Sequence, residues 1–452
     1  MDKRQVIESV NSLYTELDEL SNNLWEHPEI SGTEQKSAKL FREVLQKEGF
    51  KIIDEEAFPT AFYAEYGQGK PVIAVLGEYD ALPNLSQKCQ GTKEPVIEGA
   101  PGHACGHNLL GTAALGGAIA LKRYLQETGN KGTIRFYGCP EEEILVGKVK
   151  MIKLGMFKGC DLAISWHPMS TNMVFEGGYL ANTSVHYTFH GKTAHAAFAP
   201  ELGRSALDAM ELMNVGANYL REHVVDKTRI HYSSYSGKFS PNIVPDYAVD
   251  WYYVRAPFMS YVQDTVRRLN LVAQGAATMT ETTVDIKIDG GCCELVPNVN
   301  FADLAYANMS SIKQEELSPE ERSIAEKLVQ ALAPGVSQRE QEKYGFSTSI
   351  TTEVLPRNAC QQTSLNSSSD SGDVSQIMPM CVFTTACWPL GCAPHTWQAA
   401  AAAGSGIGRK GMHYAAKIIA GIGFDLLKNT ELDKKIIEEF KQKRNTNYVP
   451  QC

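Results

Sequence analysis

The chain has 452 residues, of which 43% are hydrophobic and 21% are charged, and its formal net charge is -9. These values are ordinary for a globular protein large enough for two or more domains. The acidic balance without a basic block argues against a nucleic-acid or anionic-membrane role, and the longest apolar run, about 109–121, is too short to span a bilayer.

The eleven cysteines are unevenly spaced along a large chain, which is unlike a disulfide scaffold. The N-terminal residues lead into a charged amphipathic helix, without the apolar segment of a secretory signal. We therefore expect a reducing, cytoplasmic compartment in which most thiols are free.

The first part of the chain predicts alternating helices and strands. Apolar residues recur at helical spacing, and short β-branched runs stand on either side of a long Gly/Ala-rich helix. The predicted helices are 6–25, 37–48, 108–127 and 146–154, and the predicted strands are 60–66, 72–77, 133–137 and 162–166. This rhythm indicates an α/β fold in which a mostly parallel sheet carries helices on both faces.

The pattern changes after about residue 177, where the order becomes strand, helix, strand, strand, helix, strand. These elements are predicted at 181–190, 204–221, 230–236, 247–254, 261–274 and 282–288. The order is that of a split, ferredoxin-like α+β domain. We expect this domain, 183–296, to be inserted between the parts 1–182 and 297–452 of a catalytic domain.

The last part predicts a return to the first domain. Its predicted helices are 299–309, 319–331, 412–428 and 432–444, with a strand at 382–386. The Ser/Asn-rich segment 361–371 predicts a mobile loop.

Cys105 and His107 flank a glycine just before the Gly/Ala-rich helix. A thiolate and a neutral imidazole are good ligands for zinc and similar ions, and Gly106 lets the backbone turn so that both side chains face one ion. A buried cysteine and a hydrogen-bonded histidine beside a helix start would give the same letters.

Further residues of the same chemical type stand where predicted strands end. Glu142 and Glu143 follow the strand 133–137, His167 follows 162–166, and His395 precedes an alanine-rich helix. A solvated acidic helix start or a surface histidine would explain each one alone. Together they favour a metal site, because ligand sites of α/β folds gather at the carboxyl ends of strands.

Taken together, these motifs resemble those of the aminoacylase/carboxypeptidase-type di-metal amidohydrolases, in the same order and over nearly the whole chain. The matching segments are 77–83, 103–108, 140–143, 166–168, 191–197 and 393–395. Within that family the chain is most similar to the aminobenzoyl-glutamate hydrolase subgroup and its related amidohydrolases and dipeptidases. Segments 106–111, 369–375 and 395–398 carry this finer resemblance.

The resemblance implies a zinc-exopeptidase-like catalytic domain with an inserted lid and dimerisation domain, hence a homodimer. It also implies one or two divalent ions, zinc or manganese. The implied metal ligands are Cys105, His107, Glu143, His167 and His395. Glu142 matches the general base and Asp80 the acid that orients a ligand imidazole. His195 matches the oxyanion-stabilising imidazole, which many relatives supply across the dimer interface, and Asn242 and Arg255 match groups that hold the substrate carboxylate.

The chain departs from its wider family at two positions. Glu78 stands where many relatives carry a ligand histidine, which leaves the ligands of a second ion open, with Cys105 as a candidate replacement. Asn108 replaces the aspartate that is usual in auxin-conjugate and hippurate hydrolases, and this favours the aminobenzoyl-glutamate subgroup.

The expected function is metal-dependent hydrolysis of the amide bond of a small N-acyl amino acid, with aminobenzoyl-glutamate as the expected type. A dipeptidase or an N-acyl-amino-acid aminoacylase on the same site is the alternative. A non-catalytic binding protein of the same fold would lack a base or a ligand, whereas Glu142 and all five ligand candidates are present.

Overall fold

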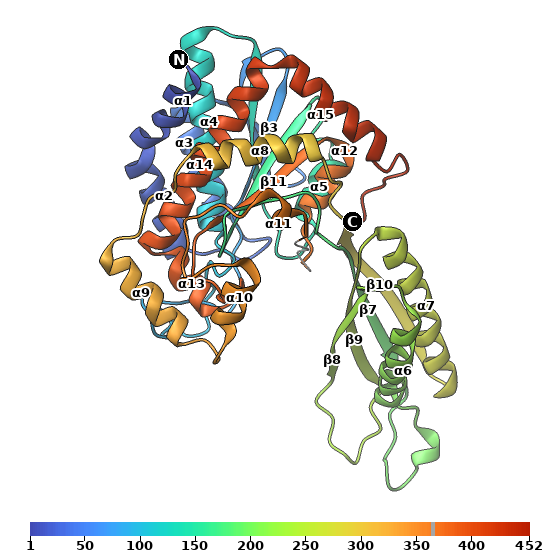
Figure 1. Ribbon diagram of the computed structural model, residues 1–452. Helices are drawn as coiled ribbons and strands as arrows, with labels where there is room; N and C mark the ends of the chain where they lie inside the picture. The colour runs from blue at the N-terminus through green and yellow to red at the C-terminus, as the bar shows by residue number, and fades with distance from the viewer. Residues whose placement is uncertain (363–366) are drawn as a thin grey trace. The chain divides into compact units, whose positions relative to one another are not determined.

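The computed structural model describes residues 1–362 and 367–452, which form two compact units (Figure 1). Of the described residues, the first unit contains 1–177, 296–362 and 374–448, and the second contains 178–295, 367–373 and 449–452. In the described part of the chain, no helix combines the length and the hydropathy that a membrane span requires.

A mixed sheet forms the centre of the first unit, with seven strands among the described residues. In sheet order the strands are β1 (Lys51–Asp54), β2 (Phe62–Gln68), β4 (Gly132–Cys139), β3 (Val72–Glu78), β5 (Leu162–Met169), β11 (Met380–Ala386) and β6 (Met173–Phe175). The central strands β4, β3, β5 and β11 run parallel, and the outer strands pair antiparallel. The predicted α/β fold with a mostly parallel sheet is confirmed.

Both faces of this sheet are covered, because β3 and β11 are buried at every position. The long helices α4 (His107–Thr128) and α14 (Gly406–Lys428) pack against the sheet and against each other. A Cβ atom at Gly117 would lie 2.4 Å from Cγ2 of Ile419, so the small residues of α4 are what permit this close packing.

The remaining helices surround this core. They are α1 (Lys3–Ser9), α2 (Tyr14–Glu26), α3 (Gln35–Lys47), α5 (Gly147–Lys153), α8 (Val299–Ser311), α9 (Pro319–Gln330), α10 (Val336–Tyr344), α11 (Arg357–Gln362), α12 (Ser371–Ile377), α13 (Trp397–Ala403) and α15 (Thr430–Lys443). The predicted loop 361–371 includes residues 363–366, which lie outside the described residues, and its last residue begins α12.

The predicted helix 6–25 is wrong in one respect, because a 3-10 turn at Val10–Leu13 separates α1 from α2. The hydroxyl of Ser9 donates to the carbonyl of Val6, and that of Ser12 donates to the carbonyl of Ser9. Such local side-chain bonds compete with the backbone pattern of an α-helix.

The second unit contains an antiparallel sheet, which in the described residues has the order β10-β7-β9-β8. Its elements are β7 (Ala181–His190), α6 (Ala206–Leu220), β8 (Arg229–Ser236), β9 (Tyr247–Ala256), α7 (Met259–Met279) and β10 (Thr283–Cys292). They follow the predicted split order, and alternate residues of β9 are buried because one face of the sheet packs on α6 and α7.

Candidate metal centre

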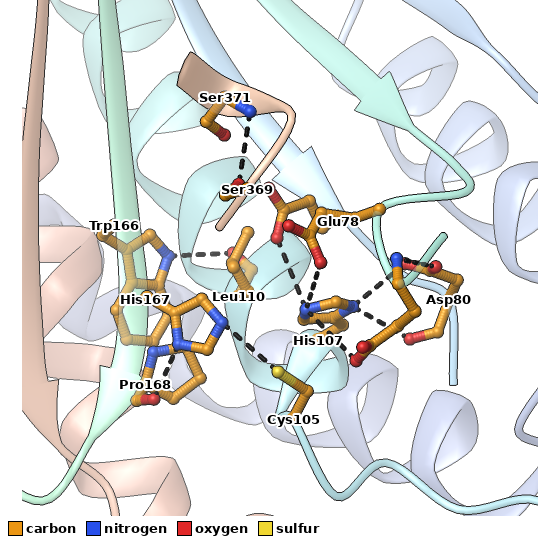
Figure 2. Close-up of polar contacts among 12 residues, drawn as sticks. Glu78, Asp80, Cys105, His107, Leu110, Trp166, His167, Pro168, Ser369 and Ser371 are labelled. Atoms are coloured by element: carbon orange, nitrogen blue, oxygen red, sulfur yellow. Dashed lines mark hydrogen bonds and ion pairs between the residues drawn. The ribbon is translucent and has the colours of Figure 1, made fainter. Parts of the chain in front are cut away.

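Asp80 and His107 are joined where β3 ends and α4 begins (Figure 2). His107 is fully buried, and its Nδ1 lies 3.0 Å from Asp80 Oδ1. Asp80 Oδ2 accepts from the Ser31 hydroxyl and from the Glu143 backbone N–H, both at 2.8 Å. Burial raises the pKa of Asp80, but the hydrogen bonds from His107 and its other donors outweigh burial and hold this pKa below its usual value. Asp80 thereby fixes the ring so that His107 Nε2 faces the candidate site.

Three buried carboxylates surround the free side of that ring. From His107 Nε2 the distances are 3.4 Å to Glu78 Oε2, 3.9 Å to Glu142 Oε2 and 3.9 Å to Glu143 Oε1. Lys148 adds a buried cation, with its Nζ 2.6 Å from Glu78 Oε1. His107 Nε2 nevertheless makes no hydrogen bond. A nitrogen lone pair that faces several carboxylate oxygens is an arrangement that a divalent cation stabilises.

Cys105 and His167 approach this cluster from the start of α4 and from β5. Cys105 Sγ lies 3.4 Å from His167 Nε2, and His167 Nδ1 lies 2.8 Å from the carbonyl of Pro168 (Figure 2). Burial lowers the pKa of His167 to about 4, which keeps the imidazole in its neutral, metal-binding form. Burial and the nearby Glu143 raise the pKa of Cys105, so a thiolate at this position requires a cation beside it.

His395 reaches the same cluster from the loop before α13. Its Nε2 lies 3.2 Å from Glu143 Oε2, and its backbone N–H donates to the carbonyl of Ala104 at 2.9 Å. His395 has a φ of 64°, a left-handed conformation that is uncommon outside glycine. The backbone conformation and the bond to Ala104 together turn this half-exposed imidazole toward the other candidates.

Gly106 is required between Cys105 and His107. Its φ is 75°, and a Cβ atom there would lie 2.7 Å from Cγ of Pro168. Only glycine allows the backbone to turn this closely past the end of β5, as the sequence predicts.

Three overlapping groups of donors could hold an ion, and the donor atoms of each group lie within 4.8 Å of one another. The groups are Cys105, His107 and His167; Cys105, Glu143 and His395; and Glu78, His107 and Glu142. The first two share Cys105, and the first and third share His107. Nitrogen, sulfur and oxygen donors in this mixture fit zinc or a similar transition ion, and the shared donors fit two neighbouring ions. The structure therefore brings together all five predicted ligands, Glu142 and Asp80.

His195 and Asn242 belong to the second unit, on segments just beyond the ends of paired strands. His195 follows β7, Asn242 precedes β9, and the backbone of Ala196 donates to the carbonyl of Asn242 at 2.9 Å. His195 Nδ1 accepts from the backbone N–H groups of Ala197 and Phe198, at 3.3 and 3.0 Å. Because Nδ1 is an acceptor, the neutral ring carries its proton on Nε2 and can donate from there.

Arg255 lies at the opposite end of β9 from His195 and Asn242. Residue 190 of β7 pairs with Tyr247 at the start of β9, and Arg255 follows eight residues later. At about 3.3 Å per residue, this separation is about 26 Å. The three residues therefore do not form one cluster within the second unit.

Lys148 is the residue of the cluster that the sequence interpretation missed. It lies on α5 and is fully buried, with buried Leu145 and Met151 three residues away on either side. A lysine on the apolar face of a predicted helix, directly after an acidic loop, is the signal that could have identified it. Glu78, whose role the sequence left open, is its partner.

Residues 74–304 match the peptidase family M20/M25/M40. Along 97% of its length, the chain is 39% identical to a polypeptide of the p-aminobenzoyl-glutamate hydrolase of Escherichia coli (strain K12), and the match covers 94% of that relative. The chain belongs to the M20 family. This confirms the predicted resemblance and identifies the protein as a metal-dependent hydrolase that acts on amide bonds.

Other M20 relatives differ in substrate. The Xaa-Arg dipeptidase of Mus musculus is 28% identical over 70% of this chain and 73% of its own length. The N-acetylcysteine deacetylase of Bacillus subtilis (strain 168) is 29% identical over 59% of this chain and 72% of its own.

Solved structures show the same fold. An aminobenzoyl-glutamate utilization protein from Klebsiella pneumoniae aligns with a TM-score of 0.63 and 16% identity, covering 93% of this chain and 98% of that one. A dinuclear metal-binding M20 peptidase from Bacillus subtilis aligns with a TM-score of 0.61 and 19% identity, covering 92% and 99%.

Proposed function

We propose that this protein hydrolyses the amide bond of an N-acyl amino acid that carries a free carboxylate, with p-aminobenzoyl-glutamate or a close analogue as the substrate. The convergence of five ligand candidates and Glu142 around His107 carries the reaction class. The match to the p-aminobenzoyl-glutamate hydrolase of Escherichia coli, which covers nearly the whole chain, supports the substrate.

The metal ligands would be Cys105, His107, Glu143, His167 and His395. A divalent ion held there supplies a Lewis acid that lowers the pKa of water and polarises the amide carbonyl. The thiol of Cys105 favours zinc, while the carboxylates also suit manganese. Asp80, bonded to His107 Nδ1, keeps that ligand in the required tautomer.

Glu142 is the general base in this proposal. Its carboxylate reaches the edge of the cluster, 3.9 Å from His107 Nε2. There it takes a proton from the attacking water and returns it to the leaving nitrogen. His195 donates from Nε2 to the oxyanion of the tetrahedral intermediate, a role for which its accepted bonds at Nδ1 select the correct tautomer.

A homodimer would supply His195 and Asn242 from one subunit and Arg255 from the other. Within one chain Arg255 is about 26 Å along β9 from the other two, which is too far for all three to contact one small substrate. The second unit is accordingly proposed as the lid and dimerisation domain, and the first as the catalytic domain.

A cytoplasmic location is proposed from the thiols. All ten cysteines whose side chains the structure describes are free, and most are buried. A reducing compartment keeps thiols in this state.

Reconstitution with defined metals followed by a substrate panel tests the function. We expect p-aminobenzoyl-glutamate to be hydrolysed faster than β-alanyl dipeptides or N-acetyl amino acids. Faster turnover of the dipeptides would instead establish the dipeptidase alternative, which the similarity to the Xaa-Arg dipeptidase supports. No hydrolysis of any acyl amino acid or dipeptide with zinc or manganese would refute the proposal.

A further inference from the structure

Two arginines on the open face of the second unit's sheet stand directly opposite each other. In the register of β8 and β9, Arg229 pairs with Arg255. Residues opposite each other on antiparallel strands project from the same face, with Cβ atoms about 4.5–5.5 Å apart. Like charges at such a pair destabilise a sheet. An anion bound between the two guanidinium groups would remove this repulsion.

Neither guanidinium forms an ion pair with any residue that the structure describes. Arg229 donates to the carbonyl of Thr228 at 2.9 Å, and Arg255 lies 6.0 Å from the ring centroid of Tyr253. Nε of Arg255 is buried without a hydrogen-bond partner. Asp289 acts electrostatically on Tyr253, but its carboxylate is already paired with a histidine and a lysine. The charges of the two arginines thus remain available to a ligand.

His231 reports the positive potential around this pair. It is the next residue of β8 on the open face and pairs with Tyr253. Burial lowers the pKa of His231, and Arg255, Arg221 and Arg229 lower it further. Several arginines therefore act on one place of the sheet, and the group that fits there is an anion.

A pocket adjoins the pair along both strands. It has a volume of about 260 Å³ and is lined by His231, Tyr232, Ser233, Trp251 and Tyr253. Its mostly aromatic walls can pack against methylene groups. A ligand that enters it reaches the arginines directly, because His231 and Tyr253 are two residues from Arg229 and Arg255.

We propose that Arg229 and Arg255 together bind the two carboxylates of a dicarboxylic amino acid, and that Arg229 selects glutamate over glutamine on the leaving side of the substrate. The inference rests on the proposed function, which assigns Arg255 to the α-carboxylate. Each planar guanidinium can hold one carboxylate through two parallel hydrogen bonds. Three saturated carbons separate the carboxylates of glutamate, a span comparable to the ~4.8 Å between neighbouring strands.

The test compares p-aminobenzoyl-glutamate with p-aminobenzoyl-glutamine in the full-length, metal-loaded enzyme. Arg229→Gln should lower kcat/KM for the glutamate substrate more than for the glutamine substrate, by about tenfold to a hundredfold and mainly through KM. Arg229→Lys should restore part of the preference, because it keeps the charge but not the planar donor pair. The control is Arg267→Gln, which removes an exposed α7 arginine paired with Asp264 and should leave the preference unchanged.

Equal losses for both substrates in Arg229→Gln, or a wild-type enzyme without preference between them, would overturn the inference. Calorimetry with glutarate and butyrate supplies a readout that needs no turnover. Wild type should bind glutarate more tightly, and Arg229→Gln should lose that difference. If wild type hydrolyses no acyl amino acid yet shows this binding pattern, the proposed function fails while the dicarboxylate site stands. If glutarate binds no better than butyrate, the site itself is refuted.

Discussion

Lys148 Nζ lies 2.6 Å from Glu78 Oε1, and both side chains are buried beside the candidate metal ligands. Burial raises the pKa of Glu78, but Lys148, followed by His107 and His167, opposes burial and holds this pKa below its usual value. Glu78 is therefore an anion whose charge the protein itself balances. This pair occupies the position at which many relatives place a ligand histidine.

Replacing Lys148 by methionine should expose how the cluster is balanced. Removing one partner of a buried ion pair costs about 3–5 kcal/mol, because the other charge stays buried. We expect this loss in the chelator-treated protein and a smaller loss with zinc, since a cation beside Glu78 restores part of the balance. Denaturant unfolding in both conditions measures it. Lys153→Met, on the exposed side of α5, is the control, and equal losses with and without metal would contradict the prediction.

Glu142→Gln should separate catalysis from metal binding. The amide keeps the shape of the side chain but cannot accept a proton, so turnover should fall by about 10²–10⁴-fold. Metal content should stay at the wild-type level. A variant that loses bound metal would show Glu142 to be a ligand, as its grouping with Glu78 and His107 also allows.

Cys105→Ser should change which metal the protein prefers. A hydroxyl is a harder and weaker donor than a thiolate, so zinc affinity should fall more than manganese affinity. Competition titrations with each metal give the ratio. An unchanged ratio would mean that the buried Cys105 only packs against His167.

Mixing two inactive variants tests the shared active site. In a dimer of Glu142→Gln and His195→Ala subunits, one of the two sites would contain both wild-type residues if His195 acts across the interface. Random reassociation should then recover about one quarter of wild-type activity. Two copies of Glu142→Gln mixed at the same concentration serve as the control. Without recovery from a mixture that demonstrably exchanges subunits, His195 serves its own chain or no site.

Asp250 should make the stability of the second unit depend on pH. It is buried on β9, where it accepts from the Ser234 hydroxyl at 2.5 Å and from the amide of Asn214 at 3.2 Å. Burial raises the pKa of Asp250 to about 6, against an opposing effect of these hydrogen bonds. Between its unfolded pKa near 3.9 and this value the folded state binds more protons, so the free energy of unfolding falls as pH rises.

Asp250→Asn removes this titration. Relative to wild type, the variant should gain stability from pH 4 to pH 7, by up to about 3 kcal/mol. Thermal unfolding of both proteins across this range gives the difference curve, and Asp285→Asn, on the exposed end of β10, is the control. A flat difference curve would show that Asp250 is ionised in the fold at no cost.

Local sequence patterns predicted most elements of the fold, because helical spacing and β-branched runs follow directly from burial. The short elements β1, β6 and α10 were missed, since few residues carry too little periodicity. The position of β11 between β5 and β6 could not be predicted either. Strand order depends on contacts between segments about two hundred residues apart, which no local window contains.

The metal-ligand candidates were predictable because each ends a strand or begins a helix at one edge of the sheet. Lys148 was not, because a lysine within a helix ordinarily points to solvent. The roles of His195, Asn242 and Arg255 remain predictions. Their distribution along β9 became apparent only from the register of the second sheet.

The late arrival of β11 has a consequence for biosynthesis. This strand is encoded after residue 379, yet it fills the gap between two strands that are complete by residue 175. Until the ribosome has passed Ala386, the nascent first unit presents an unpaired, strongly apolar edge on β5, the kind of edge that promotes association with other chains. His395 is translated later still. Protection of that edge during synthesis, rather than the supply of metal, therefore sets the first requirement for a functional enzyme.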